Sequence, residues 1–380
     1  MRSLTGRALT NILTAAAVAA SLGSVFSSIG AAQAQACFVY VANNNSTVSI
    51  YSVDAATGSL TDAGLASLDP TSSSFSLAVN PAQTFLYVGT NSGHGTWGFA
   101  IDADSGALTP LADSPFPLFA SLSLAVDLSG RFLIAALGGP NVSSYRIDPD
   151  TGGLTFASIV IGGTPWSVTF EPSGQYVYVA NVNSNNVSGF HLNADSGELT
   201  AVPGSPFTAG ANPSRVVADP SGRFLYVSNS NGSNVSAYRI AADTGSLSPL
   251  PGSPFPTRPL PAAMVIDPSD SYLYVANFDN IDGFSIDPDT GALAPLQGSP
   301  FPGGDSTALD LAMDPSGQYV YAANHDARKL TVLALDAATG TLSLSSMAPS
   351  PGLPLAIRLI AAPPDSHNGF ARGLTPQNSH

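Results

Sequence analysis

The 380-residue sequence is poor in the side chains that carry most protein chemistry, with one cysteine, five histidines and only 12 lysines and arginines. A lone cysteine, Cys37, cannot form an internal disulfide, so burial must hold the fold. Scattered histidines with one cysteine provide no zinc-binding set, and we expect no metal and no cofactor. The basic residues stand against 26 acidic ones, and the net charge of −14 excludes nucleic acid as a partner because it repels phosphate.

Long hydrophobic runs are also missing, except near the N-terminus. Residues 12–32 carry no charge, are rich in Ala, Leu and Val, follow Arg2 and Arg7, and lead into two small-x-small cleavage sites. This pattern is typical of a secretory signal peptide over residues 1–36, and it predicts a secreted or periplasmic protein without a membrane span after cleavage. One alternative is a retained anchor, for which the run is too short and too broken by Ser and Gly. The other is lipidation at Cys37, which lacks the usual Leu-small-small sequence before it.

Repetition is what the sequence has in abundance, with 36 glycines and 31 prolines marking its turns. Seven units of 44 to 48 residues each open on an aromatic residue, near positions 38, 85, 132, 176, 224, 272 and 319. A unit contains an alternating strand such as Tyr176–Asn181, a second strand, an Asp-x-x-Thr-Gly-x-Leu turn such as 287–293, and a short third strand. Its fourth strand ends in Asp-Pro-Ser-Gly. Four short strands per unit predict a propeller blade.

We therefore expect an all-β protein, a seven-bladed β-propeller over residues 37–366 with four antiparallel strands per blade, followed by a polar tail at 367–380. The phase of the repeat places the last strand, 354–362, beside the first, 38–43. The C-terminal strand then closes the ring and removes an exposed edge, and we expect a monomer. A solenoid is the alternative, but it needs capping repeats that the sequence does not contain.

The Tyr-Val-Ala-Asn strands and Asp-x-x-Thr-Gly-x-Leu turns resemble those of the lactonase-type propellers. That family includes 6-phosphogluconolactonase-like proteins and carboxymuconate-cyclizing relatives, and borders on the YVTN-repeat surface proteins. The resemblance covers residues 38–366 and implies the propeller fold together with hydrolysis of a small lactone. Enzymes of the family carry Pro-Arg-His where this chain has Pro213-Ser214-Arg215. They also carry a Glu after one of the Tyr-Val-Ala-Asn-type strands, where this chain has no carboxylate.

The innermost strand of each blade carries the clearest chemical signal, four positions before its terminal Asp. That position holds, in chain order, Ser76, Ser123, Ser167, Arg215, Ala263, Asp310 and, with a one-residue shift, Arg358. We expect this column to ring the mouth of the central channel. Arg215 and Arg358 suit a small anionic or polyhydroxylated ligand, with Trp166 and Ser167 beside them. The alternative is a structural Arg–Asp–Arg network that closes the channel, since partly buried charges are usually paired.

Two functional hypotheses follow from these residues and the resemblance. A lactone hydrolase needs a general base for water and a cation for the oxyanion. Arg215 and Arg358 can be the cation, and His325 is the candidate base, although a loop histidine is more often simply solvated. The first hypothesis is an exported lactonase-like hydrolase of a small lactone or sugar-acid derivative, with a degenerate catalytic motif. The second is a non-catalytic propeller that binds a ligand, a cell-surface polymer or a partner protein.

Overall fold

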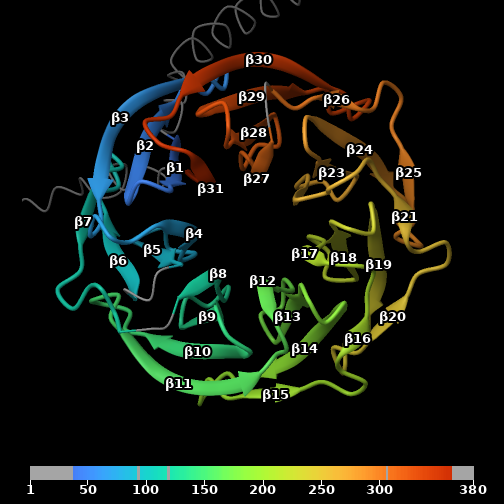
Figure 1. Cartoon of the computed structure of the whole chain (residues 1–380), viewed down its shortest axis with the longest axis horizontal. Helices are drawn as coiled ribbons and strands as arrows, with labels where there is room; N and C mark the ends of the chain where they lie inside the picture. Colours follow the sequence, from blue (N-terminus) through green and yellow to red (C-terminus); the bar gives the residue numbers. More distant parts are fainter. Residues whose placement is uncertain (1–36, 92–94, 118–119, 305–306, 362–380) are drawn as a thin grey trace, which may run out of the picture. The chain divides into compact units, whose positions relative to one another are not determined.

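Seven β-sheets are arranged in a ring whose innermost strands surround a central axis, as Figure 1 shows for the computed structural model. The structure describes residues 37–91, 95–117, 120–304 and 307–361. Over these residues the chain contains 31 strands and no helix, hence no helix long and apolar enough to span a membrane. The expected seven-bladed β-propeller is confirmed. The expected signal peptide, 1–36, and polar tail, 367–380, lie outside the described residues.

Four blades have four strands each, which follow one another from the channel outward. Blade 1 comprises β31 (Pro354–Ala361), β1 (Cys37–Asn43), β2 (Thr47–Val53) and β3 (Leu60–Ser67). Blade 2 comprises β4 (Ser74–Val79), β5 (Phe85–Thr90), β6 (Thr96–Ile101) and β7 (Leu108–Pro110). Blade 3 comprises β8 (Ser121–Val126), β9 (Phe132–Leu137), β10 (Asn141–Ile147) and β11 (Leu154–Ile161). Blade 7 comprises β27 (Ala308–Met313), β28 (Tyr319–Asn324), β29 (Lys329–Leu335) and β30 (Leu342–Pro349).

Three blades carry a fifth, two-residue strand. Blade 4 comprises β12 (Pro165–Phe170), β13 (Tyr176–Asn181), β14 (Asn186–Leu192), β15 (Leu199–Ala201) and β16 (Phe207–Thr208). Blade 5 comprises β17 (Pro213–Ala218), β18 (Phe224–Asn229), β19 (Asn234–Ile240), β20 (Leu247–Pro249) and β21 (Phe255–Pro256). Blade 6 comprises β22 (Ala263–Ile266), β23 (Tyr272–Ala276), β24 (Asn280–Ile286), β25 (Leu293–Pro295) and β26 (Phe301–Pro302).

The fifth strands correct the expectation of four strands in every blade, and outer-strand length explains them. In blades 4, 5 and 6 the fourth strand has only three residues, and the Ser-Pro-Phe segment supplies the remaining pairs to the third strand. Blade 2 also has a three-residue fourth strand, and there the Ser-Pro-Phe segment adds a single isolated bridge, between Phe116 and Thr96. In blades 1, 3 and 7 the outer strands β3, β11 and β30 are eight residues long and pair along the whole of the third strand. Either arrangement satisfies the backbone hydrogen bonds of the third strand.

The expected ring closure is confirmed. Strand β31 pairs antiparallel with β1, with Cys37 opposite Ala361 and Tyr40 opposite Arg358. Blade 1 is thus assembled from both ends of the described chain, as the blue and red strands of Figure 1 show side by side. Pairing β1 on both sides leaves the ring without a gap, which removes the template that an open sheet edge offers to other chains.

A repeated tyrosine contact fixes the spacing between blades. In six blades the second strand carries a fully buried tyrosine whose hydroxyl donates to a glycine carbonyl in the Asp-x-x-Thr-Gly-type turn of the next blade, for example Tyr226 to Gly291 at 2.8 Å. Gly291 has a φ of +72°, and a Cβ there would lie 2.5 Å from the Phe224 ring. Only glycine therefore lets the turn approach the neighbouring blade. In blade 3, Ile134 replaces the tyrosine, and Ser144 makes the equivalent bond to Gly197.

Candidate functional site

Near its start, the innermost strand of each blade has one residue whose side chain points to the channel mouth. The pairing register of β4, β8, β12, β17, β27 and β31 skips one residue near the strand start, which is a β-bulge. Blade 6 has Ala262 at the equivalent position, just before β22. The seven residues at this position, which we call the collar, are Phe75, Leu122, Trp166, Ser214, Ala262, Leu309 and Leu355.

The collar borders a cavity of about 510 Å³ at one mouth of the channel. Every collar residue lines it, and polar side chains from neighbouring loops extend it over blades 4 and 5: Asn183, Asn212 and Ser230. This is the end of the ring where the loops between second and third strands lie. The volume falls in the range of pockets that hold small organic ligands.

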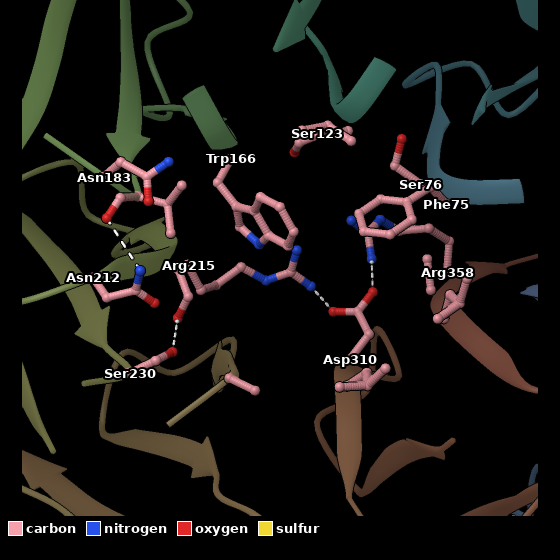
Figure 2. A pocket seen from close by; sticks show the side chains of 17 residues that line it. Phe75, Ser76, Ser123, Trp166, Asn183, Asn212, Arg215, Ser230, Asp310 and Arg358 are labelled. Carbon is pink, nitrogen blue, oxygen red and sulfur yellow. Dashed lines mark hydrogen bonds and ion pairs between the residues drawn. The ribbon is translucent and has the colours of Figure 1, made fainter. Parts of the chain in front are cut away.

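Below the collar, two arginines share one carboxylate, and Figure 2 shows Asp310 between the guanidinium groups of Arg215 and Arg358. Arg215 forms an ion pair with Oδ1 of Asp310, and Nη1 of Arg358 lies 2.8 Å from Oδ2. The Asp310 side chain is 2% exposed, whereas those of Arg215 and Arg358 are 19% and 33% exposed. These three residues, which we call the triad, come from blades 5, 7 and 1. The arginines therefore face the cavity, and the carboxylate lies behind them.

The position of Arg358 differs from the one expected from the repeats. The one-residue shift that put Arg358 in the same column as Arg215 is wrong, because Ala42 pairs with Ala356 just as Ser228 pairs with Arg215. Arg358 pairs with Tyr40 and lies two residues further along the innermost strand. Its side chain is long enough to reach Asp310 although the two residues stand at different positions along the channel.

Asp310 has no free oxygen for proton transfer. Besides both arginines, it accepts the backbone N–H of Ile357 on Oδ2 and that of Leu311 on Oδ1, each at 3.1 Å. Serines make the equivalent contact elsewhere in the ring: Ser123 accepts from the N–H of Val168. Asp310 therefore joins blade 7 to blade 1 and compensates the charge of its two partners. It is unsuited to act as a general base.

The triad carries one surplus positive charge inside an acidic protein. Burial lowers the pKa of Arg215 to about 9, and the like charge of Arg358 adds to this effect. Burial also lowers the pKa of Arg358, to about 10. Both groups remain protonated at neutral pH. Each guanidinium has five N–H donors, more than the contacts to Asp310 and Ile357 use, so donors remain for an anion in the cavity.

The other three predicted site residues, Trp166, Ser167 and His325, differ in their position relative to the cavity. Trp166 lines the cavity and is 39% exposed. Ser167 lies beside it but is 2% exposed, and its hydroxyl accepts the N–H of Val216 in the next blade, so it joins blades. His325 follows β28, bonds to Asp326 at 2.8 Å, and is not among the described residues that line the cavity. Within the described ranges, no three His, Cys, Asp or Glu side chains are grouped to hold a metal ion.

Apart from Trp166, the collar is the part of the site that sequence reasoning missed. Six of its members stand five positions before the terminal Asp, Asn or Glu of the innermost strand, and Leu355 stands five before Ile360. In every blade the collar residue comes one position before the column that contains Arg215 and Asp310. If side chains alternated strictly along the strand, a residue at that position would pack between neighbouring blades. The bulge instead turns it towards the channel. The signal was present, because this column contains both Phe75 and Trp166, large side chains at the very start of a strand.

These observations define the class of protein: a closed seven-bladed β-propeller with a ligand-sized, positively charged cavity at one channel mouth. The family model "Lactonase, 7-bladed beta-propeller" matches residues 120–206, 201–308 and 251–358, which together span more than half of the chain. The chain belongs to this lactonase propeller family.

Curated relatives share only part of their length with this chain. A 6-phosphogluconolactonase of Formosa agariphila is 31% identical over 106 residues, which are 27% of this chain and 29% of the relative. One of Serratia proteamaculans is 29% identical over 126 residues, 33% of this chain and 37% of the relative. The chain thus aligns with about a third of the length of these relatives.

Solved structures match over the whole propeller. The periplasmic gluconolactonase PpgL of Pseudomonas aeruginosa superposes with a TM-score of 0.75 and 19% identity, covering 86% of this chain and all of that one. A structure from Bacteroides uniformis described as a putative 6-phosphogluconolactonase gives the same values. At this level of identity the likeness concerns the fold.

Proposed function

We propose that this protein is an exported lactonase-like hydrolase that opens the ring of a small lactone or sugar-acid derivative in the cavity at the channel mouth. Export rests on the signal-like sequence of residues 1–36 and on the periplasmic location named for the Pseudomonas neighbour. The observation that carries the proposal is the surplus guanidinium charge of the triad, exposed to a cavity of about 510 Å³ in a chain of net charge −14.

In the proposed reaction, Arg215 and Arg358 polarise the lactone carbonyl and stabilise the oxyanion that forms on it. A water oxygen bonds to the carbonyl carbon, the bond from that carbon to the ring oxygen breaks, and the water proton passes to the departing alkoxide. The product is an open-chain hydroxy acid. The new carboxyl group releases the second water proton to the solvent, and the resulting carboxylate suits the same two guanidinium groups.

Removal of one guanidinium tests the proposal. Turnover of δ-gluconolactone and γ-butyrolactone is followed by pH-stat with the spontaneous rate subtracted. Loss of one oxyanion donor typically costs about 10²- to 10³-fold in rate, so Arg215→Ala and Arg358→Ala are each expected to lower turnover by about 100-fold. Arg239→Ala, an exposed arginine on β19, is the matched control and should retain full activity. Equal rates in all variants would contradict the proposal.

A second candidate function is ligand binding without turnover. It is favoured by one observation: among the described residues that line the cavity, Asp310 is the only carboxylate, no histidine is present, and Asp310 has no free oxygen. Water then has no protein base in the cavity to activate it. If no lactone is turned over but gluconate binds in calorimetry with a dependence on Arg215 and Arg358, the binding function replaces the catalytic one.

A further inference from the structure

The collar differs sharply from one side of the cavity to the other. Blades 7, 1, 2, 3 and 4 supply large apolar side chains, which in ring order are Leu309, Leu355, Phe75, Leu122 and Trp166. Blades 5 and 6 supply only the small Ser214 and Ala262. The polar groups Asn183, Asn212 and Ser230 adjoin this small-residue side. At the level of the collar, the cavity therefore has an apolar wall over five blades and a wall of small residues over two.

Two aromatic rings dominate the apolar wall. Trp166 of blade 4 meets Phe75 of blade 2 edge to face, with ring centroids 5.7 Å apart and planes at 88°. The two rings meet across the collar position of blade 3, where Leu122 is smaller than either ring. Together they partly cover the cavity beside the triad. Trp166 nevertheless remains 39% exposed. An exposed indole held by a T-shaped partner offers a preset apolar surface to a ligand ring.

We propose, building on the proposed function, that the cavity selects a carboxylate attached to a ring with a flat apolar face, and that Trp166 is the residue that determines this selectivity. The carboxylate meets Arg215 and Arg358 while the ring stacks on the indole. An open-chain polyhydroxylated acid satisfies the arginines but leaves the apolar wall without a partner. It also places hydroxyl groups against Leu122 and Leu355, where they lose hydrogen bonds to water.

The chain contains two tryptophans, which makes the test direct. Trp97 stacks on Phe99, is partly buried against the core between blades 1 and 2, and does not line the cavity. Trp97→Phe leaves Trp166 as the only tryptophan and as an internal fluorescent reporter. In this variant we expect benzoate to change the emission and to bind about 2- to 12-fold more tightly than D-gluconate, the size of one aromatic contact. Benzamide, which has the ring but no charge, should bind more weakly than benzoate.

Calorimetry of two further variants isolates the ring contact. Trp166→Leu keeps an apolar side chain and removes the aromatic surface, so the preference for benzoate over gluconate should fall by the factor that the ring contact contributes. Phe156→Leu, an exposed aromatic on the outer strand β11, is the matched control and should preserve the benzoate preference. Equal affinities for benzoate and gluconate in the unaltered protein, or an undiminished preference in Trp166→Leu, overturn the inference. Benzoate binding without any lactone turnover overturns the proposed hydrolysis alone and leaves this selectivity standing.

Discussion

Nη1 of Arg358 lies 2.8 Å from Oδ2 of Asp310, across the seam between the first and last blades of the ring. The same carboxylate pairs with Arg215 from blade 5, so one buried anion holds two cations from different blades. Breaking a buried ion pair from one side is strongly destabilising, because the remaining charge has lost its compensation. The triad thus couples the integrity of the ring to the charge of the cavity.

Asp310→Asn is expected to destabilise the protein by about 3–5 kcal/mol, because two neighbouring guanidinium groups lose their common anion. Chemical denaturation measures the change. Sulfate should stabilise the variant more than the unaltered protein, since an anion in the cavity can replace the missing charge. Asp326→Asn, an exposed carboxylate that pairs with His325, is the control and should change stability by less than about 0.5 kcal/mol. A small effect of Asp310→Asn would contradict the account of the triad.

Tyr226→Phe is expected to lower the free energy of unfolding by about 1–2 kcal/mol, because the buried carbonyl of Gly291 loses its donor. Tyr272→Phe is the matched control. Its hydroxyl also bonds to a carbonyl of the next blade, that of Ala337, but at 3.3 Å and in an exposed position. We expect less than about 0.5 kcal/mol there. Equal losses in urea denaturation would show that the buried contact does not set blade spacing.

Asp270 predicts a pH dependence of stability. It stands, with φ +60°, where the turns of four other blades have glycine. Burial, together with the negative charge of Asp219, raises the pKa of Asp270 to about 6. The folded state therefore holds this proton more tightly than the unfolded state, whose aspartates titrate near 4. The free energy of unfolding therefore falls as pH rises from about 4 to about 6, and ionisation of Asp270 lowers it no further above that interval.

Asp270→Asn removes this cost without changing the turn, since asparagine tolerates a positive φ. We expect the variant to be more stable than the unaltered protein by about 1 kcal/mol at pH 8, after allowance for solvent screening, and equally stable at pH 4. Thermal unfolding at both pH values measures the difference. Asp289→Asn, an exposed turn aspartate, should change neither value. A gain at pH 4 as large as that at pH 8 rules out the carboxyl pair as its cause.

Deleting β31 should abolish the cooperative fold. A chain ending at residue 353 leaves β1 with an unpaired edge and removes Ile357, which is fully buried between blades 7 and 1. We expect aggregation and loss of a sharp thermal transition. A chain ending at residue 366 keeps β31 and should melt at the temperature of the full protein. A sharp transition in the shorter chain would show that six complete blades suffice.

The repeats predicted the blades, their order and the closure of the ring, because strand alternation and turn chemistry recur in every unit and are local properties of the sequence. The triad was predicted in part. Arg215 and Asp310 share a column that the repeat defines, whereas the level of Arg358 depends on pairing with a strand at the other end of the described chain. The collar, apart from Trp166, escaped prediction for a similar reason. A bulge shifts which face a residue occupies, and only the partner strand reveals it.

The closure of blade 1 by β31 has a consequence for how the protein comes into being. The cavity draws its lining from all seven blades, and one wall belongs to the strand that is synthesised last of those described. The cavity is therefore complete only when the whole array has been synthesised and β31 has paired with β1. The ligand binding proposed above thus requires the entire propeller, and a chain that stops before β31 lacks Leu355 and Arg358 of the cavity.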